Sequence, residues 1–234
     1  MANLEFSLSK KTKCLITYLL YIFYHFIVFI LFLLILPFNL LCLIIFKNRF
    51  QKGSVLHISF PVHTAFQTVE LLKENGFNAK YLSIGKVKNW TKSDYNIQFS
   101  SNPFTRIFQE IYFFWNVISK YEIIHSHFMI SLSAFGMDFL FLKLLGRKIV
   151  IHYRGCEIRD RKKNMNLHPD INICSDCDYY PRICQDPVNI LKKNMLKNLA
   201  DSFIVTTPDM LDFIPNASVL TFFIPDYSVK PLEK

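Results

Sequence analysis

An uncharged apolar run near the amino terminus constrains this chain more than any other feature. The run covers residues 14–46, and its only members that are not apolar are Thr17, His25, Pro37 and Asn39. A helix needs ~20 predominantly apolar residues to cross the hydrocarbon core of a bilayer. We therefore expect a membrane protein. Residues 1–52 are assigned as an amino-terminal membrane-anchoring segment, with membrane lipids as its partners.

Two geometries of this segment fit the sequence. Leu15–Leu36 could form one transmembrane helix followed by an interfacial helix, because Pro37 interrupts the run and Leu40–Phe46 is too short to cross again. The alternative is a re-entrant helix pair with both ends on one side. Basic residues flank the run at both ends, so the charge distribution leaves the orientation open. A cleaved signal peptide is a poor fit, since no small-x-small cleavage site follows the run.

The net charge divides between the two parts of the chain. The formal charge is +9, of which +5 belongs to residues 1–52 and +4 to residues 53–234. The charge on the second part is too small to indicate nucleic-acid binding, and no nucleic-acid-binding module is recognisable. We expect no nucleic acid among the partners.

Residues 53–234 are enough for one domain, and short apolar runs alternate there with helical stretches. This alternation predicts an α/β fold, a single Rossmann-like domain with a doubly wound parallel sheet. The expected helices are 64–75, 104–120, 132–145 and 187–199. The expected strands are 54–60, 79–83, 94–99, 122–125, 148–153, 202–206 and 219–224.

Polar residues follow several of these strands. Ligands of open parallel sheets bind beyond the carboxyl ends of the strands, so these residues should meet at one edge. The sequence motifs are His125-Ser126-His127 after the fourth strand and Arg154-Gly155-Cys156-Glu157 after the fifth. The edge residues that we select as candidates are His63, His127, Arg154, Gly155, Glu157 and Thr207.

Two of these positions carry competing interpretations. We expect one of His125 and His127 to lie in the core and the other, His127, to reach the crevice; the alternative is a loop histidine with ordinary hydrogen bonds. The guanidinium of Arg154 suits a phosphate or carboxylate, and Gly155 would let backbone approach it. The alternative for Arg154 is a surface ion pair with Glu157 or Asp160.

A cysteine-containing loop, residues 156–186, separates the fifth strand from the last helix. Cys174 and Cys177 have the spacing of a zinc-binding turn, and Cys184 with His168 would complete a tetrahedral structural site. Cys156 competes for the fourth position. A disulfide or redox pair and unbound cysteines remain alternatives.

Three segments together resemble the amino-terminal half of retaining GT-B glycosyltransferases of the family-4 type. They are Tyr121–His127 (YEIIHSH), Gly146–Gly155 (GRKIVIHYRG) and Ala200–Asp209 (ADSFIVTTPD). The resemblance spans residues 54–225 in the family's order. The chain departs from the family after its first strand, where Phe60-Pro61-Val62-His63 replaces a glycine-rich loop.

The resemblance implies an acceptor-binding half that works with a second, nucleotide-sugar-binding half. His127 would then be the catalytic residue facing the transferred sugar, and Arg154 and Gly155 would line the acceptor side. The donor half is marked by Glu-x7-Glu, and no two glutamates of this chain have that spacing. We therefore expect a transferase that is incomplete alone and takes its donor half from elsewhere, as a truncated or split enzyme or a remnant.

The resulting expectation is sugar transfer to a lipid-linked or membrane-proximal acceptor, as in polysaccharide or glycolipid biosynthesis, with no cofactor needed for catalysis. The soluble domain is expected to face the cytoplasm, because its cysteines look reduced. A non-catalytic membrane-anchored module that binds glycan, lipid or protein is the alternative. A thiol-redox protein using Cys174 and Cys177 is a third reading.

Overall fold

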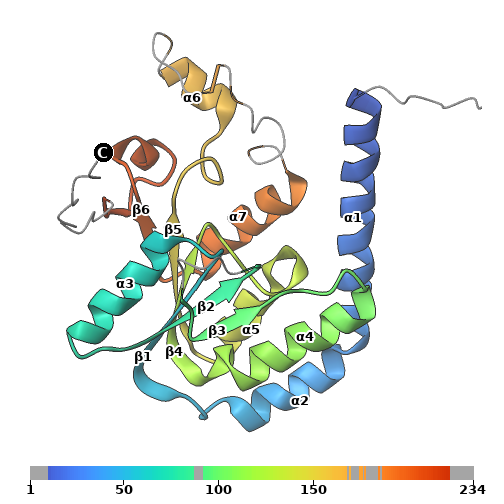
Figure 1. The fold of residues 1–234 in the computed structure, drawn as a ribbon, viewed down its shortest axis with the longest axis vertical. Helices are drawn as coiled ribbons and strands as arrows, with labels where there is room; N and C mark the ends of the chain where they lie inside the picture. The colour runs from blue at the N-terminus through green and yellow to red at the C-terminus, as the bar shows by residue number, and fades with distance from the viewer. Residues whose placement is uncertain are drawn as a thin grey trace, which may run out of the picture.

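The structure, a computed structural model, describes residues 10–86, 92–167 and 186–221, with the single positions 169, 174, 175, 177 and 184. Figure 1 shows a sheet with helices on both sides and a long helix at one edge of the molecule. The predicted fourth zinc ligand, His168, lies outside the described residues. So does the second half of the last predicted strand, residues 222–224.

The core of the fold is one seven-stranded sheet in the order β3-β2-β1-β4-β5-β6-β7, and all of its pairings are parallel. This confirms the predicted α/β Rossmann-like architecture. The strands are β1 (Gln51–Ser59), β2 (Asn78–Ile84), β3 (Tyr95–Ile97), β4 (Tyr121–His127), β5 (Lys148–Tyr153), β6 (Ser202–Val205) and β7 (Ser218–Val219).

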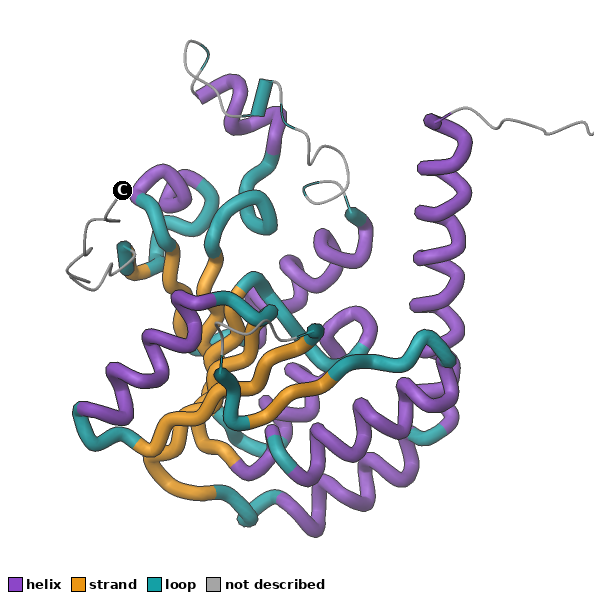
Figure 2. The backbone as a smooth tube through the Cα atoms, in the orientation of Figure 1, coloured by secondary structure: helices purple, strands orange, loops and turns teal. Residues whose placement is uncertain are grey.

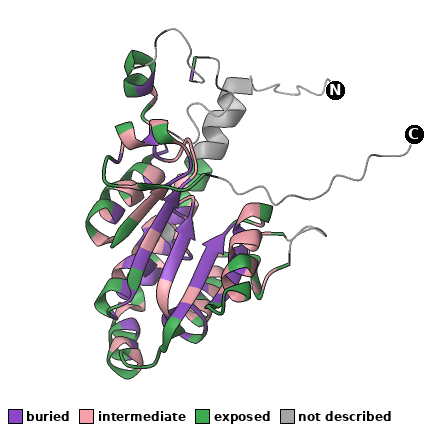
Figure 3. Ribbon diagram, turned by 90° about the vertical axis from the view of Figure 1, so that its left-hand side faces the viewer, coloured by how far each residue is buried: buried purple, intermediate pink, exposed green. Residues whose placement is uncertain are grey.

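Helices cover the two faces of the sheet unequally. Among the described helices, α3 (His63–Glu74) alone packs on one face, where its Ala65 and Val69 meet Tyr81 of β2. The opposite face carries most of the apolar core. The helices on that side are α4 (Pro103–Asn116), α5 (Met137–Leu144) and α7 (Pro187–Leu199). Figure 2 shows the same separation, and Figure 3 shows that the strands are largely buried between these layers.

Local sequence signals explain the element boundaries that the sequence predicted well. The Asp186 side chain accepts a hydrogen bond from the backbone N–H of Val188, and Pro187 occupies the first turn, so α7 begins where expected. The predicted helix 132–145 is shorter in the structure. Phe135 and Gly136 have φ angles of 60° and 76°, which are incompatible with a continuous α-helix, and α5 begins only after them.

The apolar run forms two helices, α1 (Lys10–Leu34) and α2 (Leu36–Phe46). The Leu19–Leu34 part of α1 and the whole of α2 meet at an angle of 61°. Among the described residues, no single helix has both the length and the apolar composition needed to cross a bilayer. The bent pair meets that criterion only when its two helices are taken together. The break between the two helices lies where the sequence predicted it, just before Pro37.

The apolar run packs against the domain. Trp115 of α4 donates a hydrogen bond from Nε1 to Oδ1 of Asn39 at 2.9 Å. Arg147, which is 2% exposed, donates to the backbone carbonyls of Phe46 and Lys47 and also to those of Ser119 and Leu145. These bonds tie the end of α2 to the start of β5.

Candidate functional site

Four buried histidines lie on one face of the sheet, close to the carboxyl ends of three strands. His57 of β1 pairs with His125 of β4, and His127 pairs with His152 of β5. The strand order switches between β1 and β4: β2 and β3 lie on one side of β1, and β4 to β7 lie on the other. Doubly wound sheets bind their ligands at such a switch point. The histidines therefore lie directly beneath the expected ligand crevice.

One prediction about these histidines is wrong. His125 and His127 were expected to separate between core and crevice, but they lie on the same face, with ring centroids 4.4 Å apart. Residues two apart in a strand share a face. Both are buried, and His127 is fully so. The predicted catalytic residue thus lies below the surface of the crevice.

Hydrogen bonds connect Arg154, His127 and His57 in a chain. Arg154 donates from one terminal nitrogen to Nδ1 of His127 at 2.9 Å, and Nε2 of His127 lies 3.0 Å from Nδ1 of His57. A guanidinium has donors only, so Nδ1 of His127 must accept. A neutral His127 therefore carries its proton on Nε2 and donates it to His57.

Burial keeps the four histidines neutral at physiological pH. Desolvation, with smaller contributions from neighbouring histidines and Arg154, lowers the pKa of His57 and His127 well below the ordinary value. Desolvation and the Arg154 charge lower the pKa of His125 and of His152 to about 3. Arg154 itself has its pKa lowered to about 10 by desolvation, so it remains the positive charge of the site.

A cavity of about 110 Å³ opens beside Arg154, between α3 and the ends of the strands. The second terminal nitrogen of Arg154 donates to Oγ1 of Thr64 at 2.7 Å, which links the end of β5 to the first turn of α3. Buried His152 also lines the cavity, and its Nδ1 has no hydrogen-bond partner among the described atoms. The other lining residues are Gln67, Thr68, Leu71, Leu220 and Thr221.

The backbone after β4 is strained at the rim of the crevice. Phe128 and Met129 have φ angles of 57° and 54°, in the left-handed region that residues other than glycine rarely adopt. The Phe128 ring lies 6.2 Å from that of Phe60, which follows β1, and 5.6 Å from the Arg154 guanidinium carbon. Strained backbone of this kind is concentrated at functional sites.

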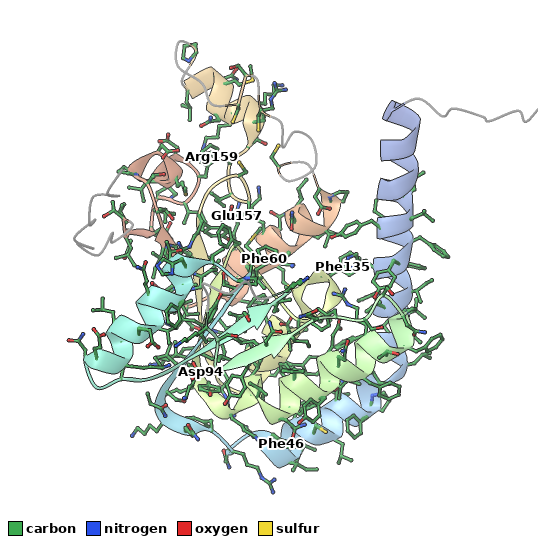
Figure 4. All side chains as sticks on the ribbon, viewed as in Figure 1. Phe46, Phe60, Asp94, Phe135, Glu157 and Arg159 are labelled. Carbon is green, nitrogen blue, oxygen red and sulfur yellow. The ribbon has the colours of Figure 1, made fainter. Side chains whose placement is uncertain are left out.

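The other predicted edge residues lie around this site, but not all of them bond to Arg154 or the histidines. Glu157 accepts hydrogen bonds from the backbone N–H groups of Arg154 and Gly155, so it shapes the turn rather than the crevice. Thr207 donates to Asp209, which is ion-paired with Arg159. In Figure 4, Phe60, Glu157 and Arg159 all lie toward the same edge of the sheet.

Two further positions differ from their predicted roles. His63 is exposed at the start of α3, with its ring centroid 6.3 Å from that of Phe66. A side chain added at Gly155 would make only ordinary van der Waals contacts, at 3.5 Å from Arg159. Among the described residues, no neighbour stands close enough to require glycine there.

Two groups of residues have the chemistry to hold a metal ion. The ring nitrogens of His57, His125 and His127 lie within 4.8 Å of one another. In the arrangement set by Arg154, however, Nε2 of His127 carries a proton, and a metal cation would also meet the guanidinium charge. We therefore assign these histidines to hydrogen bonding.

The cysteines form the second group. Cys174 is buried and accepts a hydrogen bond at Sγ from Asn164, at 3.3 Å. Burial raises the pKa of Cys156 and Cys184, and the nearby thiols of Cys177 and Cys174 raise both further. Among the described residues, however, no three cysteine sulfurs lie within 4.8 Å of one another, so the structure does not bring the predicted zinc ligands together.

Sequence reasoning missed His57, His152 and Thr64. The first two were assigned to buried strands and the third to a helix, so none stood out as polar edge residues. One signal was present in β1. Val55, His57 and Ser59 share one face of this strand, and the last two of them, toward its carboxyl end, are polar. That pattern is unusual for a strand buried on both faces.

Comparison with known proteins gives little sequence evidence. No protein-family model matches this chain, and no curated protein matches it either. The fold is similar to a solved structure of Phytolacca americana UGT2 complexed with UDP-2fluoro-glucose and pterostilbene, with 11% identity and a TM-score of 0.36. The similarity covers 74% of this chain and 53% of that one, so the chain spans about half the length of this neighbour.

Proposed function

We propose that this chain is the acceptor-binding half of a GT-B-type glycosyltransferase of the family-4 kind. A second Rossmann-like half, in a separate polypeptide or elsewhere in a longer one, would supply the nucleotide-sugar. The observation that carries this proposal is the position of Arg154. It bonds His127 of β4 and Thr64 of α3 at the switch point of the sheet, beside a cavity.

The acceptor is proposed to be lipid-linked or membrane-proximal, and to carry an anionic group next to Arg154. A guanidinium recognises phosphate or carboxylate through paired hydrogen bonds. Because its pKa stays above physiological pH, Arg154 is charged when the acceptor arrives. The Thr64 hydroxyl, which accepts from Arg154, could donate its own proton to the same anionic group.

His127 would act by orienting Arg154. Its Nδ1 accepts from Arg154, and its buried ring is held in turn by His57. In this account the transferred sugar meets the guanidinium and the rim aromatics, while the imidazole fixes their positions. Contact between His127 and the sugar, as the family resemblance implies, would require the rim at Phe128 and Met129 to move.

The test is reconstituted sugar transfer. The purified chain in lipid vesicles is supplied with labelled nucleotide-sugars, first alone and then with an extract of native cells that lack this chain. We expect transfer to lipid only after the extract is added. If the combination shows no transfer while lipid glycans still bind to the chain, the transferase proposal fails.

That failure would favour the second candidate, a non-catalytic membrane-anchored module that binds glycan, lipid or protein. The absence of Glu-x7-Glu from this sequence favours it, because no residues of the chain are marked for the donor. Binding would then use the same cavity, without any transfer step.

We also propose a structural zinc ion in the loop 156–186, held by Cys174, Cys177 and Cys184. The fourth ligand would be His168 or Cys156, and the Cys-x2-Cys spacing of Cys174 and Cys177 is what supports the proposal. Zinc there would stabilise a long loop and take no part in transfer. A cytoplasmic location of the domain is part of the same proposal, since thiolate ligands need reducing conditions.

A further inference from the structure

The helices α1, α2 and α4 are apolar on the side turned away from the domain as well as on the side packed against it. Helices of water-soluble proteins turn an apolar stripe inward and polar residues outward. In α1 and α2, the polar residues His25 and Asn39 are buried against the domain. The outward side is apolar instead, with Ile44 79% exposed.

The outward side of α4 is apolar as well. Its exposed stripe is Phe104, Phe108 and Tyr112, spaced four residues apart on one side of the helix. Phe108 is 69% exposed. The only acidic residue of α4, Glu110, is buried and bonded to Arg106 at 2.8 Å, so it adds no charge to this side.

These three helices adjoin one another, and we call their outward apolar residues together the apolar face. The ring of Trp115, at the end of α4, lies 5.3 Å from that of Phe46 of α2, and Tyr24 of α1 lies 5.7 Å from Arg106. Figures 1 and 2 show α2 running beside α4 and α1 rising from the start of α2. The exposed residues that define the apolar face are Phe23, Phe26, Ile30, Leu41, Ile44 and Phe108.

Charge identifies what covers the apolar face. Residues 10–46 contain no Asp or Glu. Lys10, Lys11 and Lys13 lie at the start of α1, and exposed Lys47 and Arg49 follow α2. Cations at both ends of a bent apolar pair match anionic lipid headgroups, which attract basic residues near a charged membrane surface. A second copy of the chain would instead bring these like charges toward one another.

We propose that the apolar face inserts into one leaflet of an anionic bilayer, so that the protein lies on the membrane through α1, α2 and the aromatic stripe of α4 without crossing it. Both basic ends then lie at the same headgroup layer. Interfacial helices bury an apolar side ~5–10 Å deep in this way. The inference does not depend on sugar transfer and can fail or hold separately from it.

The first test places a fluorophore on the stripe. The full chain carrying Phe108→Trp, in a background where Trp90 and Trp115 are replaced by Phe, is reconstituted into vesicles of phosphatidylcholine with phosphatidylglycerol. Phe77→Trp is the matched control, because Phe77 is also exposed and lies in the turn before β2. We expect brominated lipid to quench tryptophan at 108 and aqueous acrylamide to quench tryptophan at 77. Quenching at 108 by acrylamide alone would overturn the proposal.

The second test measures binding strength and topology. We expect Phe108→Asp to lower the vesicle partition coefficient by about tenfold and Phe77→Asp to leave it unchanged, with both variants retaining the wild-type circular dichroism. An impermeant amine reagent should label lysines at both ends of the α1–α2 pair from the same side. Labelling from opposite sides, or a lipid-free dimer that protects the stripe, would contradict the proposal.

Discussion

Arg154 donates a hydrogen bond to Nδ1 of His127 at 2.9 Å, and this bond determines which nitrogen of the buried imidazole carries the proton. Because His127 must then donate from Nε2, His57 completes the chain. Arg154, which is only partly exposed, is in this way held by two buried histidines. Its orientation toward the cavity is consequently defined before a ligand arrives.

Removing His57 should destabilise the domain. His57→Leu leaves the Nε2–H donor of His127 buried without an acceptor, which costs about 1–3 kcal/mol. The free energy of unfolding from urea titrations measures this loss. The control His63→Leu changes an exposed side chain and should alter stability by less than about 0.5 kcal/mol. Equal effects of the two substitutions would argue against the hydrogen-bond chain.

Stability should fall as the pH is lowered from neutral. The unfolded chain protonates its histidines near pH 6.5, while His125 and His152 in the folded state resist protonation down to about pH 3. The unfolded state therefore binds more protons between these values, and each such histidine costs about 1.4 kcal/mol per pH unit there.

Denaturation at pH 7.0 and pH 5.5 tests this dependence. The variant His152→Gln should show a smaller loss of stability between the two pH values than the wild type. Glu110 works in the opposite direction, because burial raises its pKa to about 7 and its protonation favours the folded state. A stability that rises toward pH 5.5 would mean that the histidines are not held neutral.

The loop 156–186, with Cys174, Cys177 and Cys184, should contain a zinc ion. We expect about one zinc ion per chain in protein purified without chelators, and loss of that zinc in Cys177→Ser. Cys42→Ser is the control, since Cys42 is buried in α2, away from the loop. Elemental analysis measures the zinc, and thiol titration measures the free cysteines. Zinc-free protein with an oxidised Cys174–Cys177 pair would support the redox reading instead.

Arg147 should couple the apolar helices to the domain. Its guanidinium donates to carbonyls of Phe46 and Lys47 and lies 4.3 Å from the Phe50 ring. In Arg147→Met these carbonyls lose their donor, so proteolysis between α2 and β1 should become faster. Limited proteolysis followed by mass spectrometry locates the cleavage. An unchanged cleavage rate would show that packing of α2 on α4 is sufficient alone.

The sequence predicted the fold well where signals were local. β5 and α7 have the bounds expected from their apolar runs and from Asp186 and Pro187, and the strand alternation was enough for the parallel sheet. Contacts between distant residues were not predictable in this way. Nothing near Asn39 in the sequence indicates that it meets Trp115, and a single-strand pattern does not reveal that His57 and His125 are neighbours.

The candidate site was predicted in part for the same reason. Arg154 and His127 stood out because they follow strands, and the structure brings them together. Thr64 lies inside a helix, and its role depends on where α3 packs relative to β5. Gly155 and Glu157 were selected from the same motif, but they form the turn that presents Arg154.

The most direct measurement is sugar transfer in native membranes from which this chain has been deleted. Lipid-soluble radioactivity is followed after adding labelled nucleotide-sugars, with wild type, Arg154→Gln or Lys120→Gln returned. Lys120 is an exposed cation at the opposite ends of the strands. We predict that wild type and Lys120→Gln restore one labelled lipid and that Arg154→Gln does not. Full restoration by Arg154→Gln, or no loss on deletion, would contradict the account.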